Sequence, residues 1–167
     1  MSSPSTLPKK RTGLVLVAST RAASGVYEDQ SGPLAVTWLR KQGFETPDPL
    51  VLADADIPAY FDQLVAGGNL PTVILTSGGT GLSSDDRTVE AVRPHLTKEI
   101  PGIMQAFWNQ GLQSKPTALL SCGVAGLIGS SFIMTLPGST GAVKDGCTVL
   151  EPLLTHICQQ LEDCHDH

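Results

Sequence analysis

Short apolar runs alternate with longer amphipathic segments along this chain. The clearest runs are 13–19, 71–77 and 131–136, and small residues stand at or just after the end of each. Apolar runs of this length are typical of strands that are buried on both faces. Strands that alternate with helices predict a mostly parallel sheet covered by helices on both sides. The predicted fold class is therefore α/β.

The segments between these runs carry start and stop signals for helices. Gly43 suits the position just after a helix end, and Asp56 suits the position just before a helix start. Gly146 and Pro152 disfavour an unbroken helix in the last segment. We expect helices over residues 31–42, 56–66, 86–96, 101–113 and 141–163, and two further strands over residues 48–53 and 116–121.

Length and composition indicate one globular domain. The chain has 167 residues, of which 41% are hydrophobic and 16% are charged, and a chain of this size can bury an ordinary core. We expect a flexible tail over residues 1–10 and a single domain over residues 11–167. The net charge is −5 and the basic residues cluster only at Lys9, Lys10 and Arg11, so we expect no nucleic acid among the partners.

The sequence contains neither a secretory signal nor a membrane span. Residues 1–10 lack the apolar stretch of a signal peptide, and no apolar run approaches the roughly 20 residues that cross a bilayer. The four cysteines form no CxxC pair. Two of them share the stretch 158–167 with histidines, and ligands from one terminal stretch are atypical of a closed zinc site. We expect a soluble, cytoplasmic protein with reduced cysteines and no membrane partner.

In parallel α/β folds, ligands bind beyond the carboxyl ends of the strands. This rule selects residues 19–25, 77–86 and 137–142. The segment 76–81 reads Thr-Ser-Gly-Gly-Thr-Gly and follows the clearest strand of the chain. Its glycines leave backbone N–H groups free to approach phosphate oxygens, although many such loops are tight turns needed only for packing.

Acidic side chains follow at the same predicted edge of the sheet. Asp85 and Asp86 come soon after the glycine-rich segment, and Asp54 follows the second strand. A carboxylate beside a bound phosphate is a common ligand of Mg²⁺. Alternatively, one of the adjacent aspartates is the N-cap of the helix that begins near Thr88, and Asp54 is an exposed turn residue.

Four short motifs follow one another along the chain, at residues 24–33, 75–88, 99–102 and 136–139. The second reads L-T-S-G-G-T-G-L-S-S-D-D-R-T, the third E-I-P-G and the last L-P-G-S. These motifs resemble those of the MoaB/Mog family of molybdenum cofactor biosynthesis, which includes molybdopterin adenylyltransferases and the gephyrin G domain. The resemblance extends from about residue 11 to residue 154.

The resemblance implies a three-layer α/β/α domain that binds molybdopterin and assembles as a homotrimer or hexamer. It also implies transfer of AMP from ATP to the terminal phosphate of molybdopterin, with release of pyrophosphate. Catalysis and the binding of Mg²⁺ would fall to Asp54 and Asp86. The substrate pocket would be lined by Thr76, Ser77, Gly78, Gly79, Thr80, Gly81, Pro137, Gly138 and Ser139.

The chain departs from the family pattern at three positions where many relatives carry basic residues. Ser84-Asp85 stands in place of Pro-Arg, Cys122 in place of an arginine, and Thr140-Gly141 in place of Pro-Lys. We expect Cys122 to be a small buried residue. Three other cations either replace the missing charges or lie on solvated surface: Arg21, Arg87 and Lys144.

Two alternatives to the enzyme remain at this stage. A non-catalytic paralogue of the same fold would bind molybdopterin or a precursor without turnover. The missing basic residues favour this paralogue, whereas Asp54, Asp86 and the glycine-rich segment favour the enzyme. An unrelated nucleotide-binding domain is disfavoured, because the chain has neither a GxxxxGK P-loop nor a GxGxxG fingerprint after its first strand.

Overall fold

The computed structural model describes residues 9–163 of the chain. Most of the expected tail and the last four residues, including Cys164, lie outside the described residues. The strands are β1 (Gly13–Ala18), β2 (Leu50–Leu52), β3 (Val73–Ser77), β4 (Lys98–Glu99), β5 (Ala125–Ile128) and β6 (Ser131–Leu136). The helices are α1 (Thr20–Ala23), α2 (Ser31–Lys41), α3 (Ile57–Ala66), α4 (Thr88–Val92), α5 (Pro101–Leu112), α6 (Thr140–Leu150) and α7 (Leu154–Asp163). Three short 3₁₀ helices join them: η1 (Asp54–Asp56), η2 (Arg93–His95) and η3 (Pro116–Leu120).

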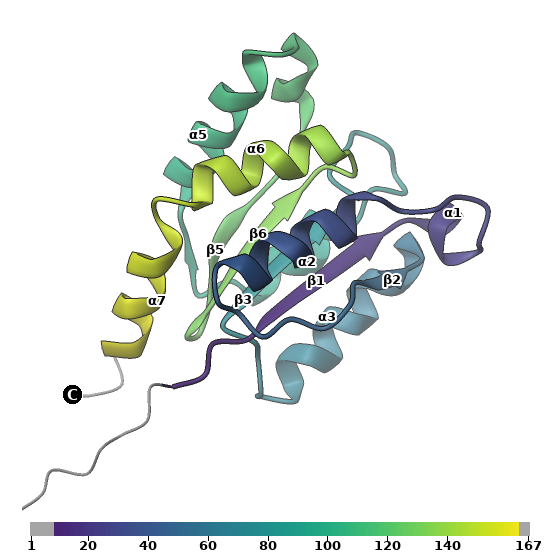
Figure 1. Ribbon diagram of the computed structural model, residues 1–167. Coiled ribbons are helices and arrows are strands. Elements are labelled where there is room, and N and C mark those ends of the chain that lie inside the picture. The colour runs from purple at the N-terminus through teal and green to yellow at the C-terminus, as the bar shows by residue number, and fades with distance from the viewer. Residues whose placement is uncertain (1–8, 164–167) are drawn as a thin grey trace, which may run out of the picture.

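The strands form a six-stranded sheet in the order β2-β1-β3-β6-β5-β4. The first four strands in this order, β2, β1, β3 and β6, pair in parallel. Strand β5 runs antiparallel to both β6 and β4. The predicted mostly parallel sheet is therefore confirmed. Because the four parallel strands point the same way, their carboxyl ends share one edge of the sheet (Figure 1).

Helices cover both faces of the sheet, which confirms the three-layer arrangement. Val15, Leu75 and Met134 pack against α2, α5, α6 and α7, while the neighbouring residues Leu16 and Ile74 pack against α3 and α4. Successive side chains of a strand point to opposite faces, so a continuous apolar run supplies both halves of the core. No helix within residues 9–163 is both long and apolar enough to traverse a bilayer.

The strand predicted over residues 116–121 is wrong. Residues 116–120 form η3, which Pro116 begins, and Leu119 and Leu120 are 57% and 55% exposed. The strand that pairs with the free edge of β6, on the side away from β3, is β5, whose sequence Ala-Gly-Leu-Ile is short and contains a glycine. The apolar composition of residues 116–121 is typical of a strand, but pairing with β6, and not composition, determines which segment becomes the strand.

Two of the predicted helices beyond residue 85 are each divided, whereas the helix predicted over residues 101–113 is confirmed as α5. The segment 86–96 divides into α4 and η2, and the long helix over 141–163 divides into α6 and α7. Pro152 lies in the break between α6 and α7, where its missing N–H prevents a continuous helix. Gly146 does not interrupt α6, and a Cβ there would lie 2.6 Å from the Leu136 side chain.

A close backbone contact fixes the end of β3. The N–H of Gly78 donates to the carbonyl oxygen of Leu136 at 2.9 Å, and Gly78 has a φ of +94°. A Cβ at Gly78 would overlap the carbonyl oxygen of Ala18 at the end of β1. Glycine is therefore required both for the left-handed conformation and for the space.

We expect Gly78→Ala to be considerably more destabilising than Gly25→Ala. Both residues have positive φ, but a Cβ at Gly25 meets nothing within 4 Å. Gly25→Ala should cost about 1–2 kcal/mol from backbone strain alone, and Gly78→Ala about 1–3 kcal/mol more from overlap. Urea denaturation of both variants measures the difference, and equal losses would contradict the role of the Ala18 contact.

An ion pair joins the start of β1 to α7. The Arg11 guanidinium donates to both carboxylate oxygens of Glu162, at 2.7 and 3.1 Å. These hydrogen bonds lower the pKa of Glu162 below its usual 4.5. A carboxylate whose pKa is lower in the folded state contributes stability above its unfolded pKa, and this contribution disappears as the pH falls through the folded value.

We expect Glu162→Gln to flatten the acid side of the stability profile. The wild-type protein should lose the Glu162 contribution as the pH falls below about 4.5, and the variant lacks it at every pH. The free energy of unfolding, measured between pH 6 and roughly 3, should therefore converge for the two proteins at low pH. Glu90→Gln, at an exposed residue of α4, is the control and should show no such convergence.

Candidate functional site

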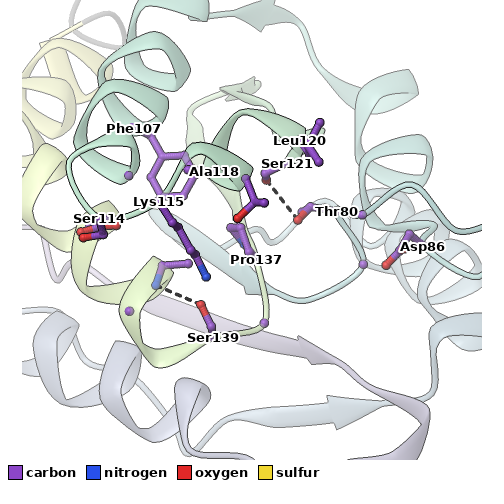
Figure 2. A pocket seen from close by; sticks show the side chains of 18 of the residues that line it. Thr80, Asp86, Phe107, Ser114, Lys115, Ala118, Leu120, Ser121, Pro137 and Ser139 are labelled. Atoms are coloured by element: carbon purple, nitrogen blue, oxygen red, sulfur yellow. Dashed lines mark hydrogen bonds between the residues drawn. The ribbon is translucent and has the colours of Figure 1, made fainter.

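A cavity of about 770 Å³ opens at the carboxyl edge of the parallel strands. This volume lies within the usual range of small-molecule sites. One wall comes from the loops that follow β3 and β6, and the facing wall comes from α5, η3 and the start of α6 (Figure 2). The apolar side chains of the walls include Leu82, Phe107, Leu120, Pro137 and Ala142.

The structure brings most of the predicted site residues to this cavity. The predicted residues that line it are Gly79, Thr80, Gly81, Asp86, Pro137, Gly138 and Ser139. Thr76, Ser77 and Gly78 are buried beneath the loop and do not line the cavity. Asp54 also lies outside it, at the end of β2.

Ser77 ties the loop to α2 through a hydrogen-bonded chain. The Ser31 hydroxyl donates to Asp29 Oδ1 at 2.7 Å and lies 2.7 Å from Ser77 Oγ. The Ser77 hydroxyl also lies 3.4 Å from the carbonyl oxygen of Pro137, to which it can donate. Asp29 also accepts from the N–H groups of Ser31 and Gly32 at the start of α2. In the sequence, Asp29 stands out only as part of the motif over residues 24–33. Its role as the hydrogen-bond acceptor at the start of α2 follows from the fold.

Thr80 ties the loop to the opposite wall. Its carbonyl oxygen accepts from the N–H of Cys122 at 2.7 Å, and its hydroxyl accepts from the Ser121 hydroxyl at 3.2 Å. The Ser121 carbonyl oxygen in turn accepts from the indole N–H of Trp108 on α5 at 3.0 Å. The glycine-rich loop and the η3 wall are therefore held together as one structure.

Asp86 is turned toward the loop and not toward α4. Its Oδ2 accepts from the N–H of Ser83 at 3.1 Å, and a Cβ at Gly81 would lie 2.6 Å from that oxygen. The N-cap position of α4 is Arg87, which makes no capping hydrogen bond through its side chain. The alternative that Asp85 or Asp86 is the N-cap of this helix is therefore wrong.

Asp54 binds the turn that follows β1. Its Oδ2 accepts from both the N–H and the hydroxyl of Thr20, at 3.1 and 2.8 Å, and Thr20 Oγ1 accepts from the Asp54 N–H. Asp54 is therefore more than a simple exposed turn residue. Within residues 9–163, no three His, Cys, Asp or Glu side chains gather as a metal-binding group.

The three cations that were candidates to replace the missing basic residues of the family pattern lie in different places. Lys144 lines the cavity, together with Lys115. Arg21 lies over the ring of Tyr27, with its guanidinium carbon 5.9 Å from the ring centroid. Arg87 lines a separate hollow of about 460 Å³ on the α3–α4 side. Sequence reasoning missed Lys115 because no motif includes it and because residues 116–121 were expected to be a strand.

The prediction that Cys122 is buried is wrong. Cys122 is exposed beside the loop, whereas Cys147 and Cys158 are buried in the core. All three of these described cysteines are free thiols. Burial raises the pKa of Cys147 to about 12, so that thiol stays protonated at neutral pH.

Comparisons with known proteins relate this chain to proteins of molybdenum cofactor biosynthesis. A family model described as a probable molybdopterin binding domain matches residues 14–156. Over 154 residues the chain is 34% identical to a molybdenum cofactor biosynthesis bifunctional protein of Chlorobaculum tepidum, and the match covers 89% of this chain and 47% of that protein. The chain therefore spans about half the length of the bifunctional relatives that it matches.

Shorter relatives match over most of their length. The chain is 37% identical over 138 residues to molybdenum cofactor biosynthesis protein B of Staphylococcus carnosus, which covers 80% of this chain and 81% of that protein. The solved structure of the molybdopterin biosynthesis Mog protein from Mycobacterium ulcerans has 40% identity and a TM-score of 0.81. Its match covers 90% of this chain and 99% of that chain.

We expect Trp108→Phe to destabilise the protein more than Trp38→Phe. Both tryptophans are half-buried, but only the Trp108 indole makes a hydrogen bond among the described residues. Loss of the hydrogen bond to the Ser121 carbonyl oxygen should lower the free energy of unfolding by about 1 kcal/mol more than replacement of the larger ring alone does. Chemical denaturation measures the loss of unfolding free energy. Hydrogen exchange of the Cys122 backbone N–H should accelerate only in Trp108→Phe. Equal behaviour of the two variants would show that this bond does not hold the wall.

Proposed function

This chain belongs to the family of probable molybdopterin-binding domains, and we propose on that basis that it transfers AMP from Mg-ATP to molybdopterin. Its named relatives are proteins of molybdenum cofactor biosynthesis. In the proposed step, an oxygen of the molybdopterin phosphate bonds to the α-phosphorus of ATP. The bond from that phosphorus to the β-phosphate oxygen breaks, and pyrophosphate leaves with the electron pair.

The observation that carries this proposal is the mixed chemistry of the cavity. Phe107, Leu120 and Pro137 offer apolar surface for a flat ring, while Thr80 and Ser139 offer hydroxyl groups beside the glycine-rich loop. Backbone N–H groups and hydroxyls suit phosphate oxygens, and apolar walls exclude water from them. A cavity with both kinds of wall fits an organic phosphate better than a bare ion or a purely apolar ligand.

The donor set around Asp86 fits a magnesium ion. Mg²⁺ usually binds through one or two carboxylates together with substrate phosphates and water. Asp86 lines the cavity, and its Oδ1 makes no hydrogen bond among the described residues. In the proposal Asp86 holds the ion together with substrate phosphates and water. The resemblance also gives Asp54 this role, but Asp54 lies outside the cavity and its Oδ2 accepts hydrogen bonds from Thr20. Bound Mg²⁺ would neutralise charge on the reacting phosphates.

The remaining residues position the substrates, since the attacking phosphate is already an anion and needs no strong base. The obstacle is repulsion between two anions that must approach in line. The amides of residues 79–81 and the Ser139 hydroxyl would bind phosphate oxygens, and the ties from Thr80 and Ser77 hold these groups in place. Such fixed donors need no reorganisation when charge shifts during the reaction.

The direct test is to mix the purified protein with molybdopterin, ATP and Mg²⁺ and to measure adenylylated product and pyrophosphate. Stoichiometric release of both products is expected. Tight binding of molybdopterin without any product would reject the transferase and would support the non-catalytic paralogue.

We expect Asp86→Asn to reduce turnover by roughly 100-fold or more, because an amide is a poor ligand for Mg²⁺ and carries no charge. Asp85→Asn is the matched control, since Asp85 is the exposed neighbour and does not line the cavity. It should retain turnover within about twofold of the wild type. Steady-state kinetics at saturating substrates measures both. Equal activity of Asp86→Asn and the wild type would remove Asp86 from the mechanism.

A further inference from the structure

Lys115 has a fixed backbone at the turn between α5 and η3. Its N–H donates to the carbonyl oxygen of Gly111 at 3.1 Å, and its own carbonyl oxygen accepts from the N–H of Ala118 at 3.3 Å. Pro116 follows directly and restricts the chain further. Only the side chain of Lys115 is therefore free to move, and it starts from a fixed point on the cavity wall.

The Lys115 side chain enters the cavity without a partner of opposite charge. Figure 2 shows it extending from its wall in the direction of Ser139. Four ion pairs of lysine or arginine occur within residues 9–163, and neither Lys115 nor Lys144 takes part in any of them. Asp86 and Asp145 also line the cavity, so two lysines and two carboxylates balance over the cavity as a whole.

The charges of the cavity are separated. Lys115 lies on one side of it and Asp86 on the other, with Thr80 and Pro137 between them (Figure 2). A ligand that fills this space meets a carboxylate at one end and an ammonium group at the other. Such a separation favours a long ligand with at least two anionic groups. One of them would be bound through a metal ion at Asp86, and another would be bound directly by Lys115.

We propose that Lys115 is a specificity-determining residue that binds a phosphate group of the substrate at the end of the cavity remote from Asp86. This inference rests on the proposed function and adds a second phosphate contact to it. The ligand chemistry is a phosphate monoester or polyphosphate, supplied either by molybdopterin or by ATP. Lys144 is the second lysine that lines the cavity. A charged hydrogen bond in a partly enclosed cavity is stronger than one to bulk solvent would be.

Two substitutions of Lys115 test the proposal. Lys115→Met removes the charge and keeps the length of the side chain, whereas Lys115→Arg keeps the charge. Lys98→Met is the matched control, because Lys98 is an exposed lysine of β4 that lines no cavity described above. Circular dichroism and thermal unfolding should be the same for all variants, since Lys115 is exposed and its fold contacts are made by the backbone.

The measurement is equilibrium binding of two probes, Mg-ATP alone and molybdopterin alone, at several salt concentrations. We expect Lys115→Met to bind one of the two probes at least about tenfold more weakly than the wild type, with a smaller dependence of affinity on salt. Lys115→Arg should restore most of the affinity, and Lys98→Met should bind as the wild type does. The probe that is affected identifies which substrate supplies the phosphate.

Parallel measurement of product formation separates this proposal from the proposed function. Probe binding that depends on Lys115 in a protein that forms no product supports the Lys115 contact and rejects the transferase. Product formation with unchanged binding in Lys115→Met overturns the Lys115 contact and keeps the transferase. A wild-type protein that binds neither probe overturns both.

Discussion

The close approach of three strand ends is the constraint on which the site depends. Gly78 at the end of β3 contacts Ala18 at the end of β1 and is hydrogen-bonded to Leu136 at the end of β6. A side chain at this point would separate the strands or displace the loop. The same contact that completes the parallel sheet therefore determines where the glycine-rich loop leaves it and where the cavity lies.

The loop is held from both sides of the sheet edge. Ser77 connects it to the start of α2 through Ser31 and Asp29, and Thr80 connects it to η3 and, through Ser121, to α5. These ties use the hydroxyls of Ser77 and Thr80 and the carbonyl oxygen of Thr80. A site fixed in this way loses little conformational freedom when a ligand enters, so more of the contact energy appears as affinity.

The sequence was most informative where structure is determined locally. The apolar runs of β1, β3 and β6 and the glycines after β3 carry their own conformational signals, and the order of the motifs placed Asp86 correctly near the loop. A strand was predicted over residues 116–121, where η3 lies, and none was predicted at β5, because the choice between two apolar segments depends on which one meets β6. Lys115 was missed for the same reason, since its position follows from that turn.

Side-chain environments were harder to predict than elements. Asp85 and Asp86 both suited an N-cap by sequence, yet the carboxylate of Asp86 turns back to Ser83 because Gly81 leaves room for it. Cys122 is apolar by type but exposed by position, since it follows η3 at the mouth of the cavity. Both outcomes depend on contacts between segments that are distant in sequence or on the path of a loop, which periodicity does not encode.

The Arg11–Glu162 pair has a consequence for access to the cavity. It brings the first strand and the last helix together at the amino ends of the parallel strands, away from the cavity (Figure 1). Neither partner of this pair lines the cavity, so the contact that joins the first strand to the last helix leaves the mouth of the cavity uncovered.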